Sequence, residues 1–264
     1  MATSTGLQAI GVSAALSPVG LVLAGAQSNW YPPEFFLPSP CNIFDQAKLP
    51  CCVSCAVATC MEALNPSWDA LSPLFHFYMC NWIRQGGAPT YFEDVTLDDG
   101  LDVLTNQGIC LLRYYDVPFT DTDAGARMPP STQAIEDGQA HSLPYNGERG
   151  LWGFSHLSDN SRINGWKRIL LGKQPILVGL YLTAGYGKNM ARLEGGSDGS
   201  RPHAVPVLGY READRAFLVQ DCQGADFAMN GRWWLPYEEV ESNTVEYAYA
   251  LGYSPRDVDE GVGA

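Results

Sequence analysis

Apolar residues in the first half of the chain recur at helical spacing between recognisable helix ends. Residues 52–64 are rich in Ala, Val, Cys and Met and contain no Gly or Pro, so we expect a buried helix there. Ser72 followed by Pro73 predicts the start of a second helix, which two consecutive glycines end. Residues 96–108 and 165–171 predict two further amphipathic helices.

The second half of the chain is typical of β-strands joined by short turns. Apolar and β-branched runs predict strands over residues 176–182, 204–210, 216–220, 232–235 and 247–253. Residues 120–160 are polar and rich in Gly, Pro, Ser and Asp, so we expect a long loop with room for short helices. Helices in one half and antiparallel strands in the other predict an α+β fold.

The composition is that of a globular protein with a full-sized core. The chain has 264 residues, 46% of them hydrophobic and 11% aromatic, which suits one large domain or two tightly fused lobes. The formal net charge of −13 argues against binding to nucleic acid or to an anionic membrane, because both need basic patches. The eight cysteines are too few for a disulfide scaffold, and four crowd into residues 51–60, so we expect thiols in a reducing compartment.

Residues 1–33 carry no charged side chain and lack the basic segment with which a signal peptide begins. Pro18 and several glycines interrupt their apolar stretch, so we expect no membrane-spanning helix. We expect residues 1–40 to form an uncharged arm, which packs on the body or docks on a partner, and a proline-rich linker or entry strand over residues 31–40. Residues 41–253 would then be the domain and residues 254–264 an acidic tail, in a cytoplasmic protein.

Cysteines cluster at the expected start of the first helix, in the sequence DQAKLPCCVSCAVAT of residues 45–59. A helix N-terminus carries partial positive charge and free N–H groups, which lower the pKa of a thiol placed there. A thiolate in this position is the usual nucleophile of cysteine enzymes that transfer acyl groups. The alternative is structural, because free cysteines also serve as small core residues.

One histidine and one aspartate stand where they could assist such a thiol. Of the four histidines, His76, His141, His156 and His203, only His203 opens a strand. Asp221 ends the next strand of the same hairpin, and the start of one antiparallel strand lies opposite the end of the next. We therefore expect Asp221 to accept a hydrogen bond from Nδ1–H of His203, which could act as general base for the thiol.

Five segments, in the same order, resemble the papain-like cysteine peptidases, especially their bacterial members. They are DQ followed by CVSCAVAT, then SPLFHFYMC, DGLDVLTNQGIC, HAV with GY, and FLVQD through WLPY. The resemblance covers roughly residues 42–240. It implies a two-lobe α+β fold with the cysteine on a helical lobe, the histidine and aspartate on a strand-rich lobe, and the active site in the cleft between them.

Two registers of the cysteine motif compete within this resemblance. CVSCA is similar to the family's CGSCWA, which would make Cys55 the nucleophile. The family's oxyanion glutamine, however, lies six residues before its nucleophile, and Gln46 stands at that distance from Cys52 whereas Leu49 does so for Cys55. Only glutamine can donate a side-chain hydrogen bond to an oxyanion, so we choose Cys52.

The resemblance implies a cysteine endopeptidase that hydrolyses peptide or protein substrates through a thioester, with no cofactor and no metal. Cys52 would be the thiolate nucleophile. His203 would be its ion-pair partner and the acid for the leaving amine, and Asp221 would orient His203. Gln46 and the backbone N–H of Cys52 would form the oxyanion hole.

Some positions depart from the family pattern. Asparagine is usual where Asp221 stands, and an aspartate favours imidazolium more strongly. Cys222 and Gln223 replace the family's Ser-Trp, so the indole that shields the triad is missing from that position. These changes remove no essential catalytic group.

Four other functions stay open at this point. Cys52 and Cys55 at a helix start also suit a dithiol oxidoreductase, although the βαβ context is missing. A zinc site would need a second closely spaced pair of ligands, and Cys110 and Cys222 are isolated in the sequence. The same Cys-His-Asp machinery could serve an acyltransferase or deamidase, and a papain-like module could serve binding or assembly without catalysis.

Overall fold

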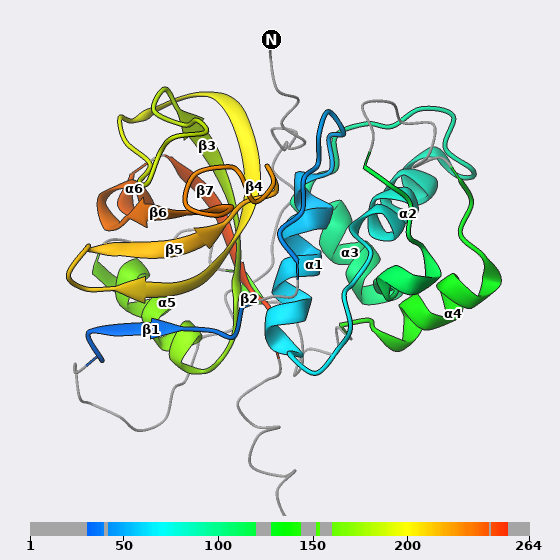
Figure 1. Cartoon of the computed structure of the whole chain (residues 1–264), viewed down its shortest axis with the longest axis horizontal. Helices are drawn as coiled ribbons and strands as arrows, with labels where there is room; N and C mark the ends of the chain where they lie inside the picture. Colours follow the sequence, from blue (N-terminus) through cyan, green and yellow to red (C-terminus); the bar gives the residue numbers. More distant parts are fainter. Residues whose placement is uncertain are drawn as a thin grey trace, which may run out of the picture.

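The computed structural model describes residues 31–39, 42–119, 128–143, 152–153, 160–242 and 244–252. Figure 1 shows two lobes, one mainly helical and one built on a β-sheet, with α1 (Cys52–Leu64) between them. The fold is therefore α+β, as the order of helices and strands predicts. Most of the expected arm and all of the expected acidic tail lie outside the described residues.

The helical lobe contains, beside α1, the helices α2 (Pro73–Gln85), α3 (Leu97–Asn106) and α4 (Thr132–Ala140) and the short 3-10 helix η1 (Leu112–Tyr114). The first three helices lie where the sequence predicts them, and α4 falls within the expected long loop. Ser72 caps α2 by accepting a hydrogen bond from the Phe75 N–H at 3.2 Å. Thr96 caps α3 in the same way through the Asp99 N–H at 3.0 Å. Such caps act within one turn, so the sequence alone identifies these helix starts.

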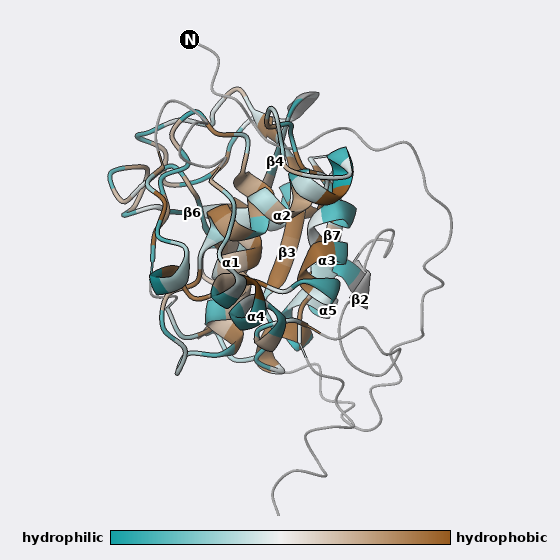
Figure 2. Cartoon of the chain, turned by 90° about the vertical axis from the view of Figure 1, so that its right-hand side faces the viewer, coloured by the Kyte–Doolittle hydropathy of each residue, from teal (hydrophilic) through white to brown (hydrophobic). Residues whose placement is uncertain are grey.

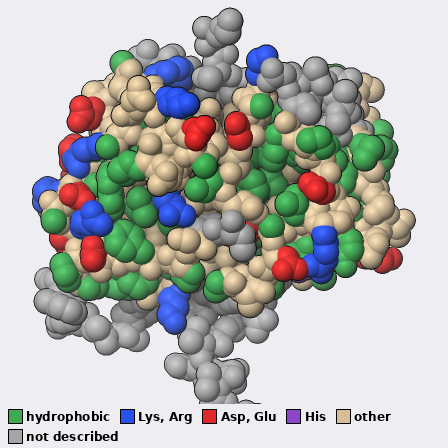
Figure 3. All heavy atoms as spheres, in the orientation of Figure 1, with side chains coloured by type: hydrophobic (Ala, Val, Ile, Leu, Met, Phe, Trp, Pro, Cys, Tyr) green, Lys and Arg blue, Asp and Glu red, His purple; other side chains and the backbone are tan. Residues whose placement is uncertain are grey.

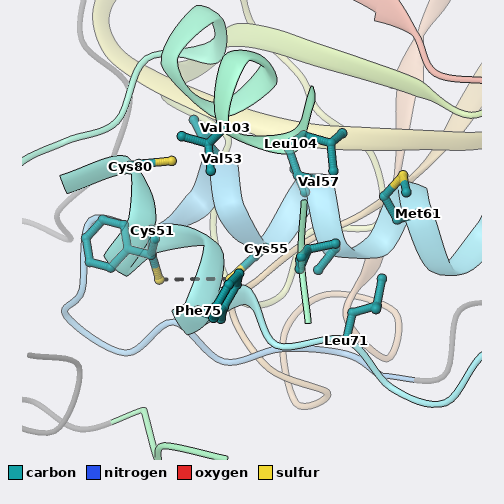
Figure 4. Packing of buried hydrophobic residues seen from close by; sticks show 14 of the residues in the cluster. Cys51, Val53, Cys55, Val57, Met61, Leu71, Phe75, Cys80, Val103 and Leu104 are labelled. Carbon is teal, nitrogen blue, oxygen red and sulfur yellow. Dashed lines mark hydrogen bonds between the residues drawn. The ribbon is translucent and has the colours of Figure 1, made fainter. Parts of the chain in front are cut away.

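α1 runs through the middle of the molecule and is buried along nearly its whole length. Figure 4 shows Val53 and Val57 of α1 beside Val103 and Leu104 of α3 in one hydrophobic cluster. The helix contacts α2 and α3 on its own lobe and β4 on the other lobe. Burial on all sides is typical of a central helix, and it fixes the first turn of α1 between the two lobes.

The second lobe is built on a seven-stranded antiparallel sheet in the order β2-β7-β3-β4-β5-β6, with β1 pairing on β4. Its strands are β1 (Glu34–Phe36), β2 (Trp152–Gly153), β3 (Ile176–Thr183), β4 (Ser197–Arg211), β5 (Ala216–Gln220), β6 (Arg232–Pro236) and β7 (Val245–Ala250). Two helices, α5 (Asn160–Leu171) and α6 (Tyr237–Glu241), contribute to the core of this lobe. Figure 2 shows β3 as hydrophobic, as expected for a strand whose side chains are buried on both faces of the sheet.

Some boundaries differ from the sequence expectation. β4 and α5 begin several residues earlier than expected, and α6 was not expected at all. β1 forms within the expected linker and pairs Phe36 with Gly209. A Cβ on Gly209 would lie 2.5 Å from the Phe35 carbonyl oxygen, so the pairing requires glycine at that position. Whether residues 34–36 form a linker or a strand is therefore decided by Gly209, a residue distant in sequence.

The seven cysteines within the described ranges are all buried thiols without a disulfide. On the face shown in Figure 3, basic and acidic side chains are interspersed. Across the described parts of the chain, none of the helices is both long enough and apolar enough to cross a membrane.

Candidate active site

Cys52 is the first residue of α1, and its side chain is fully buried. The preceding residue, Cys51, provides no side-chain cap, and its carbonyl oxygen accepts a hydrogen bond from the Cys55 N–H at 3.0 Å. The N–H groups of the first turn have no partner within an α-helix. The Cys52 N–H is one of these donors, which is the kind of group that an oxyanion hole requires.

His203 lies on β4, and Asp221 directly follows the neighbouring strand β5. The two side chains meet at 3.0 Å, so the proximity expected from the hairpin is correct. The ring atom in this contact is Nε2, so the expected bond through Nδ1 is wrong. Strand pairing determines which residues are neighbours, whereas the side-chain rotamer determines which nitrogen faces the carboxylate. Within the described residues, His203 Nδ1 has no hydrogen-bond partner.

Four donors surround the Asp221 carboxylate. At Oδ1, the Cys222 backbone N–H lies at 2.8 Å and His203 Nε2 at 3.0 Å. At Oδ2, Trp233 Nε1 lies at 2.7 Å and the Tyr186 hydroxyl at 3.0 Å. A carboxylate offers about four acceptor sites, so both oxygens are fully engaged. This saturation allows a charged group to remain buried at 4% exposure.

Burial and charge act in opposite directions on the His203–Asp221 pair. Burial raises the pKa of Asp221, but His203, the Trp233 indole and the Cys222 N–H lower it, and the pKa lies below its ordinary value. Burial lowers the pKa of His203, but the Asp221 carboxylate helps to raise it, and the pKa lies well above its ordinary value. Each partner therefore favours the charged form of the other, which is the ion pair of a carboxylate and an imidazolium.

The Cys52 thiol is close enough to His203 for the imidazole to lower its pKa. Burial acts more strongly in the opposite direction, so the pKa of Cys52 lies above that of an ordinary thiol. The expectation of a lowered pKa for Cys52 is therefore wrong for this arrangement, in which the thiol is fully buried. A thiolate shut away from water loses more solvation than His203 and the Ala204 backbone hydrogen bond together replace.

Gln46 lies in the segment before α1, which pairs with the chain after β5. Its backbone N–H donates to the Cys222 carbonyl oxygen at 2.8 Å, and Asp45 forms a bridge with Gln223. Gly224 has a φ of +84°, and a Cβ there would lie 3.1 Å from the Asp45 carboxylate. The side-chain oxygen of Gln46 accepts a hydrogen bond from the Cys222 thiol at 2.8 Å, so Nε2 is the atom with which Gln46 donates.

Cys222 is a second thiol beside His203, and the sequence did not mark it as a site residue. Its only signal is its place directly after Asp221, where the family has serine. Burial raises the pKa of Cys222, but Cys55 and His203 lower it, and the pKa lies below that of an ordinary thiol. Ligand atoms of His203, Asp221 and Cys222 lie within 4.8 Å of one another. The carboxylate is already saturated, so the set offers two available ligands where a structural zinc site uses four.

The other thiol of the motif, Cys55, has a different environment from Cys52. The Cys51 sulfur lies 3.9 Å from the Cys55 sulfur, as Figure 4 shows. Burial together with the thiols of Cys51 and Cys222 raises the pKa of Cys55 well above its ordinary value. The neighbouring groups that most affect the pKa of Cys55 are therefore thiols, whereas those that affect the pKa of Cys52 include His203.

Tyr186 and Trp233 contact Asp221, and the sequence identified neither as a site residue. Trp233 on β6 pairs with Val219 of β5, two residues before Asp221. The strand register would therefore have suggested that Trp233 lies near Asp221. Tyr186 lies in the loop after β3 and carries no recognisable sequence signal. Its ring stands edge-on to the His203 ring, with 5.8 Å between centroids.

Comparison with known proteins shows what this chain resembles in three dimensions. Neither a protein-family model nor a curated protein sequence matches it. Xylellain, a cysteine protease from Xylella fastidiosa, matches with a TM-score of 0.71 and 20% identity over 96% of this chain and 97% of its own. Procathepsin B S9 from Trypanosoma congolense matches with a TM-score of 0.67 and 17% identity, over 96% and 87% of the two chains. Bromelain from Ananas comosus matches with a TM-score of 0.60 and 14% identity, over 83% and 98%.

Likeness at this level of identity establishes the arrangement of the chain in space. In that arrangement α1 and the sheet meet with Cys52 beside His203. The protein therefore has the papain-like two-lobe α+β fold.

Proposed function

We propose that this protein is a cysteine peptidase that hydrolyses peptide bonds in peptide or protein substrates. The observation that carries the proposal is the 3.0 Å contact of His203 with Asp221 beside a cysteine at a helix N-terminus, Cys52. These three groups supply a nucleophile, a proton carrier and an orienting carboxylate. The likeness to solved cysteine proteases supports the same function.

In the proposed reaction, the open site holds Cys52 as a thiolate beside the His203 imidazolium, whose Nδ1 carries the proton, and the Cys52 sulfur attacks the scissile carbonyl carbon. The carbonyl oxygen becomes an oxyanion, to which the Cys52 N–H and Gln46 Nε2 would donate. As the C–N bond breaks, His203 passes the proton to the leaving amine, and a thioester remains. Water, deprotonated by His203, then attacks the thioester and releases the carboxylic acid and the free thiol. Asp221 holds the ring through Nε2 in every step.

The site is closed in this structure, and that favours a second candidate function. Cys52, His203 and Gln46 are 0% exposed. A peptidase would have to open this site to substrate, and contact with water would then lower the pKa of Cys52 by removing the burial that raises it. A papain-like module that serves binding or assembly would stay closed. The two candidates therefore differ in whether Cys52 becomes a reactive thiolate.

Limited alkylation with iodoacetamide near pH 6, followed by mass spectrometry of every cysteine, separates the two candidates. An ordinary thiol is almost wholly protonated at that pH, whereas a thiolate paired with histidine is not. We expect fast labelling of Cys52 that disappears in His203→Ala. Cys60→Ala is the matched control, because Cys60 lies in the same helix and burial alone raises its pKa. Uniformly slow labelling of all cysteines would support the binding module instead.

Hydrolysis of a peptide mixture then tests the roles of the individual thiols. We expect Cys52→Ala to abolish turnover, while Cys55→Ala and Cys222→Ser keep most of it. Activity that survives in Cys52→Ala and disappears in Cys55→Ala would overturn the chosen register, and the same pattern for Cys222→Ser would make Cys222 the nucleophile. Product analysis distinguishes hydrolysis from acyl transfer or deamidation, which would use the same three groups.

A further inference from the structure

The two oxygens of Asp221 have different partners. Oδ1 serves His203 and the adjacent backbone N–H of Cys222. Oδ2 faces side chains from two other parts of the fold, the indole of Trp233 on β6 and the hydroxyl of Tyr186 after β3. The reaction proposed above uses only Oδ1. The question is what the second pair of donors contributes.

The ring of Tyr186 stacks among the aromatic groups around His203. Its centroid lies 5.8 Å from that of His203, 5.1 Å from that of Phe227 and 6.4 Å from that of Trp233. Tyr186 itself is half-buried, and both Ala184 and Gly185 before it are exposed. The ring therefore lies between the solvent-facing loop and the buried His203–Asp221 contact.

The loop that carries Tyr186 is held in place by its own contacts. The Thr183 hydroxyl donates to the Glu194 carbonyl oxygen at 2.6 Å, which closes the base of the loop. A Cβ on Gly185 would lie 2.7 Å from the same Glu194 carbonyl oxygen, so glycine at position 185 allows the two ends of the loop to lie this close together. The Ala228 N–H donates to the Lys188 carbonyl oxygen at 2.7 Å. These contacts fix the direction from which Tyr186 approaches Asp221.

We propose that Tyr186 is a positioning residue for the His203–Asp221 pair, and this inference rests on the proposed peptidase function. Its hydroxyl stabilises the Asp221 carboxylate, and its ring keeps water away from the Nε2 contact. Tyr186 thereby shields the His203–Asp221 contact, a role for which this chain has no indole at position 223, where Gln223 stands.

The physical basis is the cost of a buried charge. A hydrogen bond to a charged group is stronger than one between neutral groups, and a buried carboxylate that loses one becomes easier to protonate. Without the Tyr186 hydroxyl, the pKa of Asp221 should therefore rise. Protonated Asp221 no longer favours imidazolium on His203, so the acidic limb of the pH–rate profile should move to higher pH. Loss of the ring would in addition admit water, which competes for Nε2.

Tyr186→Phe removes the hydroxyl and keeps the ring. We expect kcat/KM to fall about 10-fold, as the loss of one such hydrogen bond predicts, with the acidic limb displaced to higher pH. Tyr186→Leu should lower kcat/KM further, because the ring is lost as well. Tyr210→Phe is the matched control: Tyr210 is fully buried in the same lobe, and its hydroxyl has no hydrogen-bond partner among the described residues.

A measurement independent of catalysis separates this inference from the proposed function. NMR of protein labelled with ¹⁵N-histidine reports the His203 Nε2–H resonance and its exchange with water. We expect Tyr186→Phe to shift this resonance and speed its exchange, and Tyr210→Phe to leave both unchanged. If the resonance responds but the wild-type protein hydrolyses no peptide, the positioning role stands and the peptidase function fails. If Tyr186→Phe behaves like Tyr210→Phe in the NMR measurement, the positioning role is wrong even in an active peptidase.

Discussion

The donors around Asp221 lead to a prediction about the residue that many papain-like peptidases carry there. An asparagine at position 221 would have one acceptor oxygen and one NH₂ group. The indole N–H of Trp233 can only donate, and it lies 2.7 Å from Oδ2. If the amide NH₂ occupied that position, two donors would face each other in a buried site. We therefore expect Asp221→Asn to be strongly unfavourable in this protein.

The opposite orientation of the amide is no better. If the amide oxygen faced Trp233, the amide NH₂ group would face His203 Nε2 and the Cys222 N–H. His203 Nε2 would then have to accept, so the neutral ring would carry its proton on Nδ1 and could not take one from Cys52. Either orientation loses the carboxylate that favours imidazolium. His203 should therefore titrate at a lower pH in Asp221→Asn.

The size of the effect follows from the contacts that are lost. One hydrogen bond between charged groups contributes about 1.5–3 kcal/mol, and 1.36 kcal/mol corresponds to a factor of ten. We therefore expect Asp221→Asn to slow Cys52 alkylation at pH 6, and to lower kcat/KM, by about 10- to 150-fold. An unsatisfied buried donor should also lower the free energy of unfolding by about 1–3 kcal/mol.

Alkylation rates, kcat/KM and urea denaturation measure these effects. Asp214→Asn is the matched control, because Asp214 lies at the hairpin tip and pairs with Arg211 in a partly exposed ion pair. We expect that variant to behave like the wild-type protein. If Asp221→Asn kept its alkylation rate and kcat/KM within about threefold of wild type, the argument that these donors require a carboxylate would be refuted.

Two further predictions concern stability. Gly209→Ala should lower the free energy of unfolding by about 1–3 kcal/mol, because its Cβ would meet the Phe35 carbonyl oxygen at 2.5 Å. Urea denaturation would measure this loss. The control is Gly187→Ala, whose Cβ would meet nothing within 4 Å and which should change the free energy of unfolding little. His76 is fully buried, and burial lowers its pKa from 6.5 to about 4. The unfolded chain therefore binds more protons between these pH values, and the protein should lose about 3 kcal/mol of stability as pH falls through that window. Urea denaturation at pH 4 and pH 7 should show a smaller loss in His76→Gln, and an equal loss in both proteins would contradict the assignment to His76.

Local patterns predicted much of the helical lobe and the hairpin. Ser72 and Thr96 act within one helical turn, so the starts of α2 and α3 could be identified without knowledge of the rest of the chain. His203 and Asp221 are brought together by adjacent strands of one hairpin, and the sequence predicted their contact for that reason. For residues 31–40 the sequence left a linker and an entry strand open, and the choice depends on the pairing of β1 with Gly209 across a long separation in sequence.

The chemistry of the candidate site was less predictable than the proximity of His203 to Asp221. The amino-acid sequence by itself determined the residue types, the helix that begins at Cys52, and the hairpin that joins His203 to Asp221. Only the tertiary structure decided that Nε2 contacts Asp221, that burial outweighs His203 in setting the pKa of Cys52, and that Tyr186 reaches the carboxylate. Helix caps and hairpins are determined by neighbours in the chain. Rotamers, desolvation and contacts between loops depend on how distant segments of the chain pack, and no local sequence pattern carries that information.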